Sequence, residues 1–274
     1  EALQEAAFPL AFISRLRMAT DGAGVTALVG AQGCPLQCRM CLNPKAMRPA
    51  DKAGVSWVTP DELCGLVRQD DLYYLATGGG VTFGGGEPLC RADFIAAFRA
   101  VCPAGWRLYA ETSLHVPAEQ VRIAACCIDH FFVDIKDMNP AVYRAYTGQV
   151  MMPVRENLAL LLSLVGADRV TVRVPLIPGF NSEEDRRVSC LALHRMGVRM
   201  LDCFTSRPPA PPLNVQKKTP PKKPATIPGG DGLSRRFSLF HRISPTGLSG
   251  RQSCQSPVYI RSRKRKNAPP LQTW

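Results

Sequence analysis

Residues 25–41 read VTALVGAQGCPLQCRMC and join a short apolar run to a loop with three cysteines. The run Val25–Val29 ends at Gly30, a pattern that predicts a β-strand. Cys34, Cys38 and Cys41 follow with the spacing C-x3-C-x2-C. The cysteines therefore lie in a loop that directly follows a strand, where α/β proteins gather the residues of their sites.

The spacing of these cysteines suits an iron–sulfur cluster. Three thiolates on one short loop can hold three irons of a four-iron cluster and leave the fourth iron open to an exogenous ligand. A structural zinc ion is the alternative. Zinc takes a fourth protein ligand, usually at short spacing, and the next cysteine, Cys64, lies 23 residues beyond Cys41. The pattern favours the cluster and leaves the zinc site open.

Strand-like and helix-like segments alternate from the cysteine loop to about residue 204. A capping box at Thr59–Glu62 and an N-cap at Ser182 mark two of the helix starts. Such alternation predicts a parallel sheet of six strands with helical crossovers, either as an open partial barrel or as a doubly wound sheet. The predicted strands are 25–29, 80–83, 107–111, 131–136, 170–176 and 198–204, and the helices are 59–69, 92–101, 117–126, 140–146, 154–165 and 182–196.

The net charge of +12 is unevenly distributed along the 274 residues. Residues 1–206 hold 20 Lys and Arg against 21 Asp and Glu, whereas residues 207–274 hold 14 against one. We therefore expect a neutral globular domain over 1–206 and a basic, Pro-rich, disordered tail over 207–274. An out-of-frame chain end would give the same composition, and binding of nucleic acid by the tail is the less favoured interpretation.

The 11 cysteines and the hydropathy pattern indicate the cellular compartment in which the protein is expected to work. An odd cysteine count without a basic-then-apolar leader disfavours a secreted disulfide scaffold. No apolar run approaches the ~20 residues that a membrane-spanning helix needs. We therefore expect a cytoplasmic protein without a membrane partner.

Charged residues on otherwise apolar predicted strands predict that one face of the sheet lines a polar cavity, which we call the lumen. Alternation along 131–136 places Asp134 and Lys136 on one face, opposite Val133 and Ile135. Opposite charges on a central strand are costly unless they face a polar cavity or each other. Glu111 and Arg173 have the same placement on their strands. A buried structural ion pair is the alternative interpretation.

A glycine-rich segment, GGGEP at residues 84–88, follows another predicted strand. Gly85 and Gly86 would let bare backbone approach a ligand, and Glu87 adds a charge at the carboxyl end of the strand. A flexible turn is the alternative.

The sequence resembles the radical S-adenosylmethionine (SAM) enzymes in its cysteine motif. Within that superfamily it is similar to the glycyl-radical-enzyme activases, typified by pyruvate formate-lyase activating enzyme, over about residues 13–204. This resemblance implies a partial (β/α)6 barrel of the radical SAM type. The matching segments are DGAG at 21–24, QGC at 32–34 and CLNP at 41–44. Three departures stand out. Met40 replaces an aromatic residue, the segment before Thr59 is too short for a ferredoxin-like insert, and no histidine follows the sixth strand before His241.

The resemblance implies a role for each candidate residue. Cys34, Cys38 and Cys41 would bind the 4Fe-4S cluster, and Glu87 would accept from the amino group of SAM. Asp134 and Lys136 would line the lumen beside SAM and the incoming glycine loop as catalytic residues. A monovalent cation would lie at Glu111, Thr112 and Asp134. The full set implied to bind SAM is Asn43, Gly85, Gly86, Glu87, Glu111, Thr112, Ser113, Asp134, Lys136 and Arg173.

The resemblance also implies the reaction and the partners. The protein would cleave SAM reductively and take a hydrogen atom from a glycine of a partner glycyl radical enzyme, with a flavodoxin- or ferredoxin-like electron donor. Two alternatives stay open. One is a radical SAM enzyme that acts on a small molecule or peptide. The other is a cluster- or zinc-containing binding protein whose basic tail binds nucleic acid.

Overall fold

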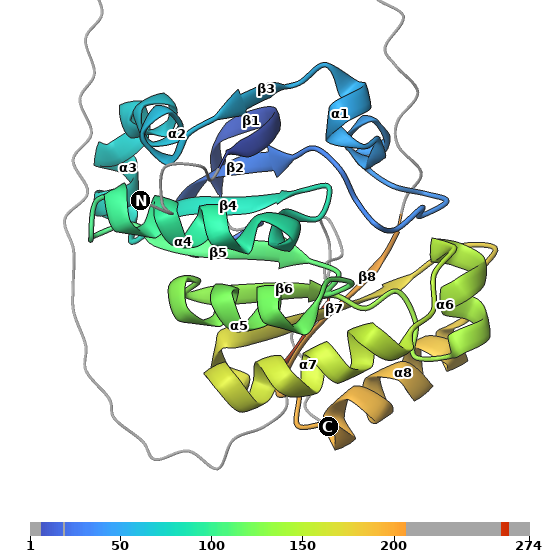
Figure 1. Cartoon of the computed structure of the whole chain (residues 1–274). Helices are drawn as coiled ribbons and strands as arrows, with labels where there is room; N and C mark the ends of the chain where they lie inside the picture. Colours follow the sequence, from blue (N-terminus) through green and yellow to red (C-terminus); the bar gives the residue numbers. More distant parts are fainter. Residues whose placement is uncertain (1–6, 19, 207–258, 263–274) are drawn as a thin grey trace, which may run out of the picture. The chain divides into compact units, whose positions relative to one another are not determined.

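Six parallel strands follow one another through a single sheet in the order in which they occur in the chain (Figure 1). The computed structural model describes residues 7–18, 20–206 and 259–262. Each strand pairs in parallel with the next. The six are β2 (Val25–Ala31), β4 (Gly80–Gly85), β5 (Arg107–Thr112), β6 (His130–Asp134), β7 (Val170–Leu176) and β8 (Met200–Thr205).

This strand order decides between the two predicted architectures. A doubly wound sheet reverses its strand order at a switch point. Here the order β2-β4-β5-β6-β7-β8 never reverses, so right-handed crossovers place all the connecting helices on the same face. Figure 1 shows α4, α5 and α7 along that face. The prediction of a partial (β/α)6 barrel is confirmed.

The helices lie close to their predicted ranges. Both predicted caps are present, because the Thr59 and Ser182 side chains each form a full capping box. The first predicted helix, 59–69, is α2, which ends at Val67 and is followed by a 3-10 turn. The short helices α1 and α3 were not predicted. The helices are α1 (Ala50–Ala53), α2 (Pro60–Val67), α3 (Asp71–Thr77), α4 (Ala92–Val101), α5 (Ala118–Cys127), α6 (Pro140–Thr147), α7 (Met152–Val165) and α8 (Glu183–Arg195).

Three strands in the described residues were not predicted. β1 (Phe8–Met18) is antiparallel to β2, and β3 (Ser56–Val58) is antiparallel to β1. β1 escapes a periodicity argument because its pairing is twice interrupted and Leu16 has a φ of 52°. β9 (Tyr259–Ser262) pairs with β8 inside the predicted tail. Residues 207–258 and 263–274 of the predicted tail lie outside the described residues. The predicted domain boundary at residue 206 stays a prediction.

The core lies between the sheet and its helices. Phe8, Phe83, Phe94 and Phe98 form a chain of ring contacts on this side. Side chains of the opposite face of the six parallel strands point into the lumen, where the polar residues gather. None of the helices in the described residues is long and apolar enough to cross a membrane.

A strained loop after β5 depends on one buried amide. Leu114 is fully buried with a φ of 58°, which is unfavourable for a non-glycine residue. Asn157 of α7, 4% exposed, donates from Nδ2 to the carbonyls of Leu114 (2.9 Å) and Val116 (2.7 Å). Asn157, the one polar residue among the buried residues of α7, therefore holds the loop that carries Ser113.

We expect Asn157→Leu to lower the free energy of unfolding by about 2–4 kcal/mol, because it leaves two buried carbonyls without donors. Urea unfolding of the variant measures this. Ser163→Ala on the same helix is the control, since Ser163 is exposed, and it should change stability by less than about 0.5 kcal/mol. Equal stability of the two variants would contradict this account of the loop.

Candidate active site

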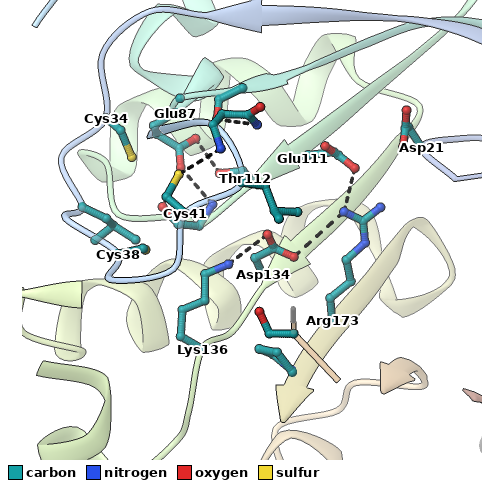
Figure 2. Close-up of a pocket in the computed structure, with 18 of the residues that line it drawn as sticks. Asp21, Cys34, Cys38, Cys41, Glu87, Glu111, Thr112, Asp134, Lys136 and Arg173 are labelled. Carbon is teal, nitrogen blue, oxygen red and sulfur yellow. Dashed lines mark hydrogen bonds and ion pairs between the residues drawn. The ribbon is translucent and has the colours of Figure 1, made fainter. Parts of the chain in front are cut away.

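One pocket of about 650 Å³ opens at the carboxyl ends of the parallel strands. All thirteen residues predicted as site residues line it. Its volume lies within the range of about 300–1,000 Å³ that holds cofactors and drug-sized ligands. Figure 2 shows the three thiols at one end and Asp21, Glu111 and Arg173 at the other, with Asp134 and Lys136 between them. The sequence therefore predicted the composition of the pocket, and the roles of its residues stay predictions.

The cysteine loop is tied to the rest of the chain by backbone hydrogen bonds. Gly33 N donates to Ala46 O (2.8 Å), and Gln37 N donates to Thr147 O at the end of α6 (2.9 Å). The Cys41 sulfur accepts from the backbone N–H of Asn43 at 3.3 Å. The loop thus has a fixed path that presents its three sulfurs to the pocket.

The donor set fits a cluster better than a single zinc ion. In the part of the chain that the structure describes, no three His, Cys, Asp or Glu side chains converge on one metal position. Three thiols on one loop suit three irons of one cluster, whereas a structural zinc ion takes a fourth protein ligand. Burial raises the pKa of Cys34 to about 12 and also raises that of Cys38. A bound metal would reverse this effect, because it deprotonates its thiol ligands.

Gly85 and Gly86 pack closely against the backbone of β2 and of the start of the cysteine loop. A Cβ on Gly86 would lie 2.2 Å from Gly33 O and 2.9 Å from Ala31 O, and one on Gly85 would lie 2.7 Å from the Gly30 α-carbon. The backbone N–H groups of Gly86 and Glu87 donate to Ala31 O and Gly33 O, both at 2.9 Å. Backbone of β2 and of the start of the cysteine loop therefore occupies the places where the Cβ atoms would be, while both glycines line the pocket. Their contact with a ligand stays a prediction.

Glu87 is turned inward and satisfied by the protein. It is 1% exposed, and its carboxylate accepts from Thr112 Oγ1 (2.7 Å), Ser113 N (2.8 Å), Ser113 Oγ (2.6 Å) and Leu89 N (3.2 Å). Burial raises the pKa of Glu87, and the hydrogen bonds from Ser113 and Thr112 oppose that shift. The carboxylate joins the end of β4 to the end of β5.

Four charged side chains form a network across the lumen. β6 ends at Asp134, so it is shorter than the predicted strand 131–136 and Lys136 lies beyond it. The Lys136 Nζ is nevertheless 3.0 Å from Asp134 Oδ2. Arg173 Nη1 lies 2.6 Å from Glu111 Oε1 and 4.0 Å from Asp134 Oδ1. Val133 and Ile135 are fully buried on the other side, which confirms the predicted alternation of faces.

Burial and the opposite charges of this network shift the pKa values of its members. Burial would raise the pKa of Asp134, but Lys136 and Arg173 outweigh it and hold that pKa below its usual value. Burial would lower the pKa of Lys136, and Asp134 outweighs it in the opposite direction. Burial raises the pKa of Glu111 despite Arg173. Both signs of charge are thus available to a zwitterionic ligand.

The residues predicted to bind a monovalent cation already have hydrogen-bond or ion-pair partners within the protein. The Thr112 hydroxyl donates to Glu87 and accepts from Leu114 N at 2.9 Å. Glu111 faces Arg173 and Asp134 faces Lys136. A cation at this place would have to exchange these contacts, and the site stays a prediction.

Sequence reasoning missed part of the far end of the pocket. Arg17 of β1 pairs with the buried Asp21, and Arg173 Nη2 donates to Thr20 O at 3.0 Å. Arg17 could not be found because β1 was not predicted. Asp21 stands in the DGAG segment that carried the resemblance and could have been proposed from it. Tyr146, whose carbonyl accepts from Arg39 N, also lines the pocket without a sequence signal.

Comparisons with known proteins show the family to which this chain belongs. Residues 28–188 match the Radical SAM superfamily. The isethionate sulfite-lyase activating enzyme of Oleidesulfovibrio alaskensis is 28% identical, with 65% of this chain and 81% of the relative covered. The pyruvate formate-lyase 2-activating enzyme of Escherichia coli is 30% identical, with 66% and 71% covered.

Among solved structures, Streptococcus suis SuiB bound to precursor peptide SuiA superimposes with a TM-score of 0.50. It is 12% identical, covers 66% of this chain and 38% of its own, and shows the shared fold alone. The match over residues 28–188 and the 30% identical relative carry the family assignment. The chain therefore belongs to the radical SAM superfamily and, within it, to the activating enzymes of glycyl radical enzymes.

Proposed function

We propose that this protein cleaves SAM reductively and takes a hydrogen atom from a glycine of a partner glycyl radical enzyme. The family uses a 4Fe-4S cluster and SAM, and the curated relatives are activating enzymes by name. The observation that carries the proposal is the single pocket, with three thiols at one end and a charge-matched lumen at the other.

Cys34, Cys38 and Cys41 would hold the cluster, and no fourth cysteine lines the pocket. When bound, the cluster supplies one electron to SAM, whose cleavage yields methionine and a 5′-deoxyadenosyl radical. Leu36 and Phe204 line the same pocket and exclude water from it.

The lumen charges would bind and orient SAM. Its methionine part carries an ammonium and a carboxylate, which Asp134 and Lys136 or Arg173 can meet as charge-assisted pairs. Glu87 is proposed as a positioning residue for Thr112 and Ser113, because its carboxylate already accepts four hydrogen bonds. We infer that the reaction takes place in the cytoplasm, where a low-potential electron donor can reduce the protein.

The experiment is anaerobic reconstitution with iron and sulfide, followed by dithionite, SAM and a glycyl radical enzyme. We expect 5′-deoxyadenosine, methionine and a glycyl radical signal in electron paramagnetic resonance. 5′-Deoxyadenosine with no glycyl radical in any of the partner enzymes tested would favour the small-molecule or peptide alternative. A protein that carries zinc and cleaves no SAM would favour the binding protein.

Arg173 provides a test of the lumen. We expect Arg173→Met to weaken SAM binding about 10- to 150-fold, since hydrogen bonds to charged groups contribute about 1.5–3 kcal/mol. Equilibrium dialysis of the reconstituted protein with labelled SAM measures the affinity. Arg173→Lys should be intermediate, because lysine keeps the charge and loses the planar fork. Unchanged affinity in Arg173→Met would assign Arg173 to a structural ion pair with Glu111.

A further inference from the structure

Four exposed, positively charged side chains lie in the chain segment that carries the cysteines or shortly after it. Arg39, Lys45, Arg48 and Lys52 are exposed, and none has an ion pair with any described residue. We call these four residues the basic rim. Residues 39–52 hold four of the 20 cations of residues 1–206 but only one of their 21 acids, Asp51. The rest of that region is net negative, so the rim is a local positive patch.

The rim is fixed to the cysteine loop. Gln32 Nε2 donates to the carbonyls of Lys45 and Arg48, both at 2.8 Å, and Gly33 N donates to Ala46 O at 2.8 Å. Gln32 and Gly33 directly precede Cys34. The rim therefore has a defined place relative to the three sulfurs.

An apolar residue stands beside the rim. Leu42 follows Cys41 directly and is 69% exposed. Its side chain has no role in the core and is bracketed in sequence by Arg39 and Lys45. A small apolar centre with charges of one sign around it is the pattern of a transient protein interface, in which electrostatics guide the encounter.

We infer that the basic rim and Leu42 form the docking surface for an acidic one-electron carrier protein with a low-potential flavin or iron–sulfur centre. The inference rests on the proposed function, which needs one electron for each SAM cleaved. At this surface the carrier would be oxidised by one electron, which the resident cluster would take up. An acidic partner fits because the rim is positive, and a redox partner fits because the surface is part of the cysteine-bearing segment.

The test compares two quadruple variants of the full-length, cluster-loaded protein. Arg39→Gln, Lys45→Gln, Arg48→Gln and Lys52→Gln together remove the rim. Arg107→Gln, Arg122→Gln, Arg155→Gln and Arg195→Gln are the matched control, since these four are also exposed and without ion pairs among the described residues. The probe is an acidic flavodoxin, and the readouts are its Kd by calorimetry and the rate of cluster reduction by stopped-flow absorbance.

We expect the rim variant to bind flavodoxin at least about tenfold more weakly at low salt, and the control variant to bind as the wild type does. Wild-type binding should weaken by a similar factor between about 50 and 300 mM salt. Leu42→Ser alone should weaken binding less than the rim variant. SAM cleavage driven by dithionite should be unchanged in the two quadruple variants, because it bypasses the carrier and none of their substituted residues lines the pocket.

Two outcomes would overturn the inference. Flavodoxin binding that is unchanged in the rim variant would place the carrier elsewhere, for example on the basic segment 207–274. A rim variant that binds flavodoxin normally but loses affinity for the glycyl radical enzyme would assign the surface to that partner. Failure of dithionite-driven cleavage in the wild type would instead contradict the proposed function.

Discussion

Cys38→Ala is expected to abolish SAM cleavage, with 5′-deoxyadenosine formation reduced by more than about 100-fold. Loss of an outer-shell partner of a metal ligand already costs about 10- to 100-fold, and Cys38 is proposed as a direct ligand. Among the described residues, three cysteines line the pocket, and none of the other described cysteines lies there to replace Cys38. Iron analysis, absorbance near 400 nm and the 5′-deoxyadenosine assay measure the effect on the same sample.

Cys126→Ala is the matched control. Cys126 is an exposed free cysteine on α5, outside the pocket, and its loss should leave iron content and activity at wild-type values. Undiminished 5′-deoxyadenosine from Cys38→Ala would remove the cluster from Cys34, Cys38 and Cys41. Iron loss in both variants would indicate a nonspecific loss of stability instead.

The sequence predicted the six parallel strands because strand-like and helix-like segments alternate from residue 25 to residue 204. This pattern alone could not choose between a partial barrel and a doubly wound sheet. That choice depends on which strands become neighbours, which is a long-range property. β1 was missed for a local reason: its bulges and the positive φ of Leu16 interrupt the alternation that a strand argument needs.

For the site, strand ends and the family resemblance together named residues that do share one pocket. They did not show what each residue contacts. Glu87 was expected to accept from SAM, and the structure adds that its carboxylate is hydrogen-bonded to Thr112 and Ser113. Gly85 was expected to let backbone approach a ligand, and it lines the pocket while the pairing of β2 with β4 places backbone where its Cβ would be. Both roles toward SAM stay predictions. Register is set by pairing across the sheet, and a single sequence does not contain it.

We expect Gly86→Ala to weaken the binding of the cluster, although Gly86 is not a proposed ligand of the iron. The added Cβ would lie 2.2 Å from Gly33 O and 2.9 Å from Ala31 O. Both contacts are with backbone atoms, so no side-chain rotation can relieve them, and Gly33 must move together with the adjoining Cys34. We expect iron retention after reconstitution to fall at least about tenfold, as for outer-shell partners of metal ligands. The metal-free protein should lose about 1–3 kcal/mol of stability through overpacking.

Gly65→Ala separates this clash from the general effect of replacing a glycine. Gly65 lies in α2, a Cβ there would meet nothing within 4 Å, and alanine gains about 1 kcal/mol of helix propensity over glycine. The control should therefore keep its iron and unfold at equal or higher temperature. If Gly86→Ala keeps full iron and 5′-deoxyadenosine formation, the cysteine loop tolerates displacement by the width of a methyl group. In that case the Gly33–Gly86 contact would not be what fixes the position of the three sulfurs.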